Sequence, residues 1–224
     1  MGWRSKYNGV MVMIIGIDDV TRCPVIGSLI VTGVVVKENM LEALQRIGVR
    51  DSKLLTHSKI MKITPVIQDI VEDYKAIYIK APEISKSNKQ YNLNDMECNA
   101  FCTIVREFEA KYPIAQVQIN NFDYSREKFI ERAEKLGFHF DWSKWVIDHE
   151  NETRDIPVGA ASIIGKSLSI KEYENLKKKY GDFGSGNPGD PKTIEFVKQK
   201  LREKRKCNII RYNWATVKRL AKSI

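Results

Sequence analysis

The chain has 224 residues, of which 43% are hydrophobic and 29% charged, and this balance excludes a disordered or fibrous protein. Its length allows one domain with a sizeable buried core. The formal net charge of +9 favours an anionic partner, and nucleic acid is the commonest one.

No segment of the sequence is both long enough and apolar enough to indicate a membrane-spanning helix or a signal peptide. The longest apolar run, residues 25–36, contains Gly, Ser and Thr and is too short to cross a bilayer as a helix. Residues 1–10 are polar and lack the apolar centre of a signal peptide, so we expect a flexible N-terminal segment there. We therefore expect no membrane association.

The cysteines indicate an intracellular protein. None of the four belongs to a CxxC pair, so we expect no zinc site. Cys98 and Cys102 are four residues apart in a predicted helix, which favours two core thiols on one face. Without a disulfide framework, we expect a cytoplasmic location.

The first half of the chain begins with two strand-like runs. Residues 12–17 are apolar and lead to Asp18 and Asp19, and the β-branched run 25–36 follows. The link between them, residues 20–24, is short enough for an antiparallel hairpin. After them, the pattern predicts helices at 41–47 and 56–74 and a third strand at 75–80.

The second half alternates helices with single strands. Residues 94–97 have the form of a capping box, which predicts a helix from there to about residue 111. The remaining predicted elements are a strand at 115–119, a helix at 125–136, a short strand at 145–147, a helix at 160–180, a Gly-rich loop at 181–190, and basic helices at 191–204 and 214–223.

This order of elements predicts an α/β fold with a mixed sheet. No composition shift marks a linker. We expect three parts: the flexible segment 1–10, a main domain over 11–180, and the loop and basic helices of 181–224 packed on that same domain.

Adjacent carboxylates at the end of an apolar strand are the first chemical signal. Asp18 and Asp19 point to opposite faces if the strand continues, so a turn must begin there for both to converge. By itself, an Asp-Asp pair before a turn is more often simple turn chemistry.

Six short blocks, taken together, are far more specific. They include Asp18-Asp19, an Asp-Ser-Lys, an Asn-Leu-Asn, an Ala-Ala-Ser-Ile-Ile helix, a Gly-Ser-Gly loop and a terminal Arg and Trp. Their positions are 16–27, 48–56, 91–95, 160–166, 180–193 and 210–214. In this order they resemble the archaeal-type ribonuclease HII family over residues 13–220.

The resemblance implies a ribonuclease H-like mixed sheet flanked by helices, with a C-terminal helical extension. It also implies two-metal hydrolysis of RNA in RNA–DNA hybrids, with Mg²⁺ or Mn²⁺ held by oxygen ligands. The family's four metal-binding carboxylates are Asp, Glu, Asp and Asp. The resemblance places these positions on Asp18, Asp19, Asn120 and Glu152.

This set departs from the family's. Asp19 keeps the charge but is one methylene shorter, and Asn120 offers an uncharged carbonyl oxygen. We therefore expect weakened metal binding. Asp123 and Asp155 are alternative ligands near these positions, and His149 matches a family histidine that could assist leaving-group protonation or serve a structural purpose.

The residues that would read the ribose are also changed. The family's Gly-Arg-Gly turn brings backbone close to a 2′-hydroxyl, and here it is Thr21-Arg22-Cys23. The family's Tyr in the Gly-rich loop is Asn187.

The positions that would line the nucleic acid or support the site are better kept, at Arg22, Lys53, Ser162 and Lys166. A basic C-terminal surface adds phosphate contacts or is only a solvated face. Its residues are Lys178, Lys179, Lys192, Lys198, Lys200, Arg202, Arg205 and Lys218.

Two functions stay open on the sequence. One is a divergent, metal-dependent ribonuclease HII-like endonuclease, possessing reduced activity because of its altered site. The other is an inactive family member that binds hybrid, duplex or structured RNA. We expect a monomer, and charge alone suggests association with a larger ribonucleoprotein.

Overall fold

The computed structural model describes residues 12–49, 54–149, 154–203 and 206–224. A five-stranded sheet lies at its centre, in the order β3-β2-β1-β4-β5. The strands are β1 (Met13–Val20), β2 (Leu29–Lys37), β3 (Asp73–Ile79), β4 (Ile114–Asn120) and β5 (Trp145–Asp148). The sheet is mixed, because β1–β2 and β2–β3 are antiparallel whereas β1–β4 and β4–β5 are parallel. The expected α/β class is confirmed.

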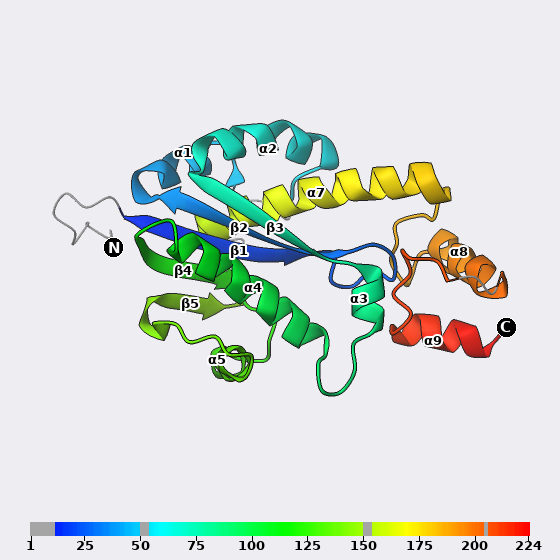
Figure 1. The fold of residues 1–224 in the computed structure, drawn as a ribbon. Coiled ribbons are helices and arrows are strands. Elements are labelled where there is room, and N and C mark those ends of the chain that lie inside the picture. Colours follow the sequence, from blue (N-terminus) through cyan, green and yellow to red (C-terminus); the bar gives the residue numbers. More distant parts are fainter. Residues whose placement is uncertain (1–11, 50–53, 150–153, 204–205) are drawn as a thin grey trace.

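Helices cover both faces of this sheet (Figure 1). Their bounds are α1 (Leu41–Arg46), α2 (His57–Ile70), α3 (Ala81–Ser85), α4 (Leu93–Glu109), α5 (Arg126–Lys135), α7 (Ile156–Tyr180), α8 (Pro191–Arg202) and α9 (Ala215–Lys222). Short 3₁₀ turns are η1 (Glu38–Met40) and η3 (Trp142–Lys144). One face carries α1, α2 and α7, and the other carries α4 and α5.

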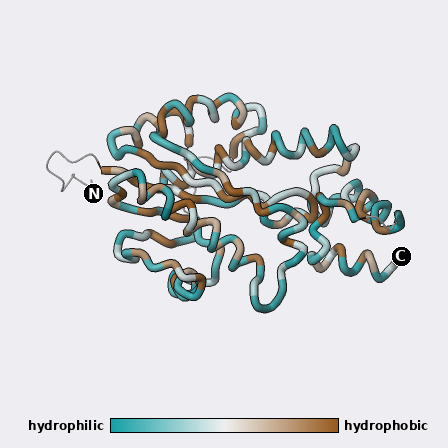
Figure 2. The backbone as a smooth tube through the Cα atoms, viewed as in Figure 1, coloured by the Kyte–Doolittle hydropathy of each residue, from teal (hydrophilic) through white to brown (hydrophobic). Residues whose placement is uncertain are grey.

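The hydrophobic pattern explains this layering. β2 is buried along almost its whole length, as expected for a β-branched strand covered on both faces. Figure 2 shows hydrophobic residues gathered along the strands and hydrophilic ones on the outer faces of the helices. A third cluster, which includes Val25, Ile26, Phe183 and Val197, packs α8 and α9 against the loop after β1.

A close approach fixes α7 against the central strand. A Cβ on Gly16 would come within 2.1 Å of the backbone carbon of Pro157, so glycine is required at this crossing. Ala160, Ala161, Ile163 and Ile164 then pack into the core above β1 and β2. This contact sets where the first turns of α7 lie relative to the end of β1.

Three local predictions were wrong. No turn begins at Asp18, because β1 continues in register with β2 through Val20. Residues 25–28 are not part of a strand, and β2 begins at Leu29. α4 begins two residues earlier than expected, because Asn92 forms the capping box with Asp95.

The structure also bears on the cysteines and on the possibility of a membrane-spanning helix. All four cysteines are free thiols, and Cys98 and Cys102 are fully buried in the core. Among the helices in the described ranges, none combines the length and the apolar character needed to cross a bilayer.

Candidate active site

Asp18 and Asn120 meet at the carboxyl ends of two parallel strands. Ile17 of β1 is in register with Ile119 of β4, so the next residues along each strand are neighbours. The Asn120 Nδ2 group donates a hydrogen bond to Asp18 Oδ1 at 2.9 Å. Asp18 is only 3% exposed. The sequence placed both residues in the metal site, and the structure brings them together.

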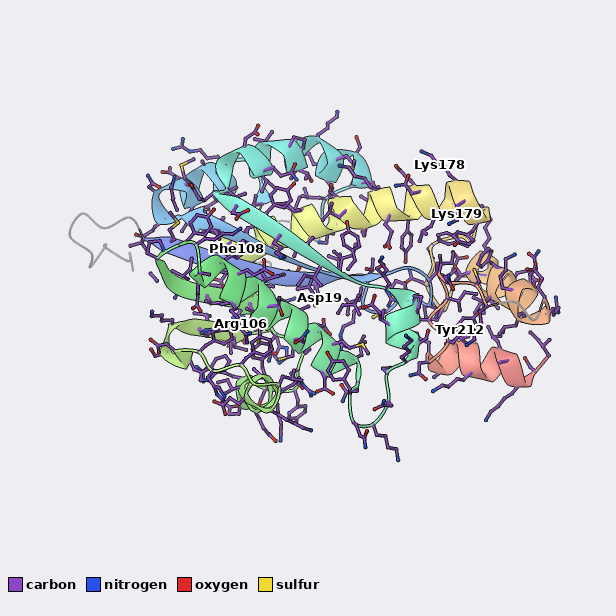
Figure 3. All side chains as sticks on the ribbon, viewed as in Figure 1. Asp19, Arg106, Phe108, Lys178, Lys179 and Tyr212 are labelled. Carbon is purple, nitrogen blue, oxygen red and sulfur yellow. The ribbon has the colours of Figure 1, made fainter. Side chains whose placement is uncertain are left out.

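Asp19 follows Asp18 within the strand, so the two side chains leave opposite faces. Figure 3 shows Asp19 in the middle of the molecule, at the end of β1 above α4. On the α4 side, the fully buried Glu97 carboxyl hydrogen bonds with Asp19. Burial raises the pKa of Glu97, outweighing the opposing effects of Arg22 and of that hydrogen bond.

A small cavity of about 350 Å³ joins these groups to α7. Its lining residues are Asp18, Asp19, Val20, Thr21, Asn120, Ser162, Lys166 and Ser169. Ser162 is 1% exposed, and its hydroxyl makes no hydrogen bond within the described part of the chain. An unused buried hydroxyl beside two carboxylates indicates a polar occupant.

The residues around this cavity fit a hard divalent ion. Two carboxylates and an amide oxygen are the type of ligand that Mg²⁺ and Mn²⁺ take in proteins. Within the described ranges, no three His, Cys, Asp or Glu side chains form a metal-binding group. Glu152, the expected fourth ligand, lies outside those ranges, as does Lys53.

At Thr21, where the resemblance to the family expects a Gly, the backbone has a conformation that glycine favours. Thr21 has φ 62°, a left-handed value that β-branched residues rarely adopt. Its hydroxyl donates to the Ser28 carbonyl at 2.7 Å, closing the loop between β1 and β2. The structure therefore keeps a glycine-like bend at Thr21, a position where the sequence suggested damage.

Arg22 is held on the α4 side of this loop. Its Nε donates to Glu97 at 2.9 Å and its terminal nitrogen donates to Asn94 Oδ1 at 2.5 Å. The guanidinium carbon also lies 5.8 Å from the centre of the Phe122 ring. Cys23, the next residue, is exposed. The three residues of the changed turn are thus a strained Thr, an anchored Arg and an accessible thiol.

Asp123, which the sequence offered as an alternative metal ligand, forms an ion pair with Arg132. It is 7% exposed and accepts a hydrogen bond from Arg132 Nε of α5 at 2.6 Å. Arg132 also forms an ion pair with Asp95 at the start of α4. Burial alone would raise the pKa of Asp123, but the hydrogen bonds from Arg132 and from the Tyr124 N–H hold it below its ordinary value. Its carboxylate is therefore engaged in joining α4 to α5.

The other expected residues lie around the edge of the site. His149 is exposed, and its Nδ1 is 3.0 Å from the Asn121 carbonyl oxygen. Asp155 is half-buried and is the N-cap residue of α7. Asn187 is exposed in the Gly-rich loop. Lys166 is half-buried on the cavity wall.

Three residues near the site were missed by sequence reasoning. Asp148 is in register with Asn120 on β5, and its carboxylate pairs with Arg154 at 2.7 Å. The signal was available, because Asp148 directly follows a short strand. Glu97 and Arg211 are fully buried charged residues, and no local pattern marks a charged residue as buried.

The fold and the site define a class before any relative is considered. A mixed five-stranded sheet, flanked by helices and carrying carboxylates where its central strands end, is a ribonuclease H-like fold. The sequence profile described as Ribonuclease HII matches residues 15–217. The chain belongs to the ribonuclease HII family, whose members are metal-dependent endoribonucleases.

Relatives from archaea agree with this assignment. The chain is 35% identical to a ribonuclease HII of Pyrococcus furiosus over 211 residues, which cover 93% of this chain and 91% of the relative. It is 32% identical to a ribonuclease HII of Methanocaldococcus jannaschii over 218 residues, covering 93% and 94% of the two chains.

Solved structures show the same fold. The ribonuclease H2 of Pyrococcus horikoshii superimposes with a TM-score of 0.82 at 29% identity, covering 95% of this chain and 98% of the other. A ribonuclease HIII crystallised with Mn²⁺, described as Bst-RNase HIII, gives a TM-score of 0.82 at 20% identity and covers 96% and 71%. At that identity the likeness concerns the fold alone.

Proposed function

We propose that the protein is an endonuclease that cuts the RNA strand of RNA–DNA hybrids with a divalent metal ion, and that its metal dependence is altered. The observation that carries this proposal is the buried Asp18 carboxylate, which lies beside Asn120 and shares a cavity with Asp19 and Lys166. Phosphodiester hydrolysis needs such carboxylates next to a cationic group.

Each residue has a distinct part in this proposal. Asp18 would hold the metal, which when bound supplies Lewis acidity and an activated water. Asp19 lines the same cavity, but its side chain leaves the opposite face of β1 and hydrogen bonds with Glu97, so its part would be to add negative charge beside the metal. Lys166 lines the same cavity and would attract the scissile phosphate. Ser162 offers a buried hydroxyl that can donate to a phosphate oxygen.

Asn120 distinguishes this site from that of its family. Its amide donates to Asp18, so one Asp18 oxygen is already engaged by a neutral neighbour. To bind a cation, the amide must present its oxygen instead of its nitrogen. We therefore expect the site to require more Mg²⁺ than a four-carboxylate site and to work better with Mn²⁺, which tolerates poorer ligand sets.

The substrate would be held mainly through its phosphates. The net charge is +9, and the C-terminal part contributes Lys178 and Lys179 at the end of α7 (Figure 3). Contacts of this kind are sequence-independent and weaken with salt. A related structure is described as a complex of PCNA with the ribonuclease HII of Archaeoglobus fulgidus, and its TM-score is 0.79 at 27% identity.

Cleavage of an end-labelled RNA–DNA hybrid tests the proposal. The wild type is incubated with Mg²⁺ and with Mn²⁺ beside Asp18→Ala, and Asp69→Ala on the exposed surface of α2 is the matched control. We expect cleavage by the wild type and the control, stronger with Mn²⁺, and at least about a 100-fold lower rate for Asp18→Ala.

The inactive binding module is the alternative outcome of this experiment. It requires that the wild type binds the hybrid in a salt-sensitive manner but leaves it intact with both metals. In that case the retained Asp18 and Asp19 would not be catalytic, and the endonuclease proposal would be withdrawn.

A further inference from the structure

The buried Arg211 guanidinium binds the loop between β1 and β2 through three backbone carbonyl groups. Its Nε donates to the Gly27 carbonyl at 2.9 Å. Its two terminal nitrogens donate to the Arg22 carbonyl at 2.9 Å and the Thr21 carbonyl at 2.7 Å. Arg211 therefore holds both ends of the loop that contains the changed ribose-reading turn.

Neighbours of Arg211 bind more of the same loop. The Arg211 backbone N–H donates to the Val25 carbonyl at 2.9 Å. The Trp214 indole N–H donates to the Cys23 carbonyl at 3.1 Å. The carbonyl groups of Thr21, Arg22 and Cys23 thus all accept hydrogen bonds from residues that lie 189 to 191 positions later in the chain.

The segment that carries Arg211 is itself anchored. The Tyr212 backbone N–H donates to the Ser85 hydroxyl of α3 at 2.9 Å. The Asn213 amide donates to the Ser87 hydroxyl at 2.9 Å. Figure 3 shows Tyr212 where the C-terminal segment passes between α3 and α9. Arg211 therefore projects from a fixed backbone, and its planar fork imposes one geometry on the loop.

A buried arginine is a costly way to fill space. Arg211 is 0% exposed, and none of the ion pairs in the described ranges includes it. Burial lowers the pKa of its guanidinium to about 10. All three of its side-chain nitrogens donate to backbone carbonyls, and its guanidinium carbon lies 5.2 Å from the Trp214 ring centre. The guanidinium group stabilises the orientation of the Thr21, Arg22 and Gly27 carbonyls, and all three belong to the loop between β1 and β2.

We propose that Arg211 is a positioning residue for ribonucleotide recognition: it fixes the carbonyls of Thr21 and Arg22 away from the substrate. A carbonyl oxygen facing a phosphate or an acceptor oxygen would repel it. With these carbonyls bound to Arg211, the loop can offer the substrate its N–H groups and the Arg22 side chain. This inference rests on the proposed function, because it concerns how that site selects its substrate.

The test compares Arg211→Met and Arg211→Lys with the wild type, and Arg46→Met is the matched control. Arg46 is exposed at the end of α1 and pairs with Glu42 at 2.6 Å, so this control removes one guanidinium outside the basic C-terminal surface. Without metal, fluorescence anisotropy measures the dissociation constants of a duplex holding one ribonucleotide and of the same duplex made of DNA alone.

The ratio of these two dissociation constants reports ribonucleotide recognition. We expect Arg211→Met to lower this preference at least 5-fold, while binding of the all-DNA duplex changes less than 2-fold. Arg211→Lys keeps the charge but not the fork, so it should restore part of the preference. With Mn²⁺, the same change should raise KM far more than it lowers kcat. Arg46→Met should keep the wild-type ratio.

A second measurement, the accessibility of the Cys23 thiol, reports on the conformation of the loop and does not depend on enzymatic activity. Cys23 is the exposed cysteine and the other three are buried, so the rate of thiol labelling reports the loop. We expect labelling of Cys23 to quicken at least 3-fold in Arg211→Met, under conditions where melting curves show the variant folded.

The outcomes separate the two proposals. A wild-type preference that survives unchanged in a folded Arg211→Met variant overturns the positioning role and leaves the proposed function intact. Labelling of Cys23 at the wild-type rate in that variant also overturns it. A wild type that neither cleaves nor prefers the ribonucleotide duplex overturns the proposed function, and the positioning role with it.

Discussion

Asn120 differs from an aspartate by having an amide nitrogen in place of one carboxylate oxygen, and this nitrogen contacts Asp18. The amide nitrogen donates to Asp18, where a carboxylate would repel Asp18 and so require a cation between them. The neutral pair is stable without metal, whereas an acidic pair gains most from metal. Under the proposed function, we therefore expect Asn120 to stabilise the metal-free site and to weaken metal binding.

Replacing Asn120 by Asp should reverse this balance. We expect the Mg²⁺ concentration for half-maximal hybrid cleavage to fall about 10-fold, which corresponds to about 1.4 kcal/mol of metal binding. Titration of Mg²⁺ in the cleavage assay measures it. Asn99→Asp, at an exposed position of α4, is the matched control and should leave the titration unchanged. An unchanged titration for Asn120→Asp would remove Asn120 from the ligand set.

Thr21 keeps a left-handed conformation through its hydroxyl group. Thr21→Val has nearly the same shape and the same backbone strain but cannot donate to the Ser28 carbonyl. We expect it to lower the free energy of unfolding by about 1 kcal/mol, measured by urea denaturation. Thr103→Val at a half-buried position of α4 is the control. Equal losses in the two variants would mean that the Thr21 hydroxyl has no special part.

Some individual residues of the candidate site could be predicted from the sequence, whereas others could not. The first family block contains Asp18, the resemblance placed the third ligand on Asn120 after its strand, and these two residues are hydrogen-bonded. The loop conformation could not be predicted, since a Thr at a glycine position indicates a lost bend unless its hydroxyl partner is known. Glu97 and Arg211 were missed because their partners are backbone groups or residues distant in the chain.

At the scale of elements, the contact between β1 and α7 determines how the cavity is built. Asp18 lies two residues after Gly16, and Ser162 lies five residues after Pro157, so the Gly16–Pro157 contact brings the two cavity walls together. The strand and the helix approach closely only because Gly16 has no side chain.

Gly16→Ala therefore tests this crossing. The added methyl would overlap the Pro157 backbone at 2.1 Å, which cannot move without shifting α7. We expect a loss of about 3 kcal/mol in the free energy of unfolding by urea denaturation. Gly189→Ala, where nothing lies within 4 Å of the added Cβ, should change it by less than about 0.5 kcal/mol. Similar values for both variants would contradict the packing argument.

The joint between α4 and α5 is electrostatic and should depend on pH. The pKa of Asp123 is held below its ordinary value in the folded protein. Its stabilisation is therefore complete above the unfolded pKa and is lost as pH falls through the lower, folded pKa. We expect Asp123→Asn to cost about 2 kcal/mol at pH 7 and much less near pH 2.

Urea denaturation at both pH values measures this difference, and Asp69→Asn on the surface of α2 is the control. A cost that is the same at pH 7 and pH 2 would show that the Asp123 charge is not what joins the two helices.

At the scale of the whole molecule, the sequence predicted the fold because its blocks are collinear with those of one family. Local element prediction also succeeded where the pattern was regular, as in β4 and α5. It failed at the end of β1, because strand pairing with β2 holds both Asp18 and Asp19 in extended backbone. That pairing is a tertiary effect, which the Asp-Asp dipeptide does not reveal.

The molecule combines a basic composition, a candidate metal-binding edge of the sheet, and a loop that is bound by the C-terminal segment. The C-terminal segment, expected to be a basic appendage, also contributes Arg211 to the loop beside the active site. Recognition and cleavage would then depend on contacts between residues at opposite ends of the chain. Selectivity for a ribonucleotide would then follow from this arrangement.

The most direct measurement is the cut position in an end-labelled duplex that holds a single ribonucleotide, with Mn²⁺ and the wild-type protein, beside the same duplex of DNA alone. The account predicts one cut next to the ribonucleotide, none in the DNA duplex, and neither product with Asp18→Ala. Equal cutting of both duplexes, or a cut that persists in Asp18→Ala, would contradict it.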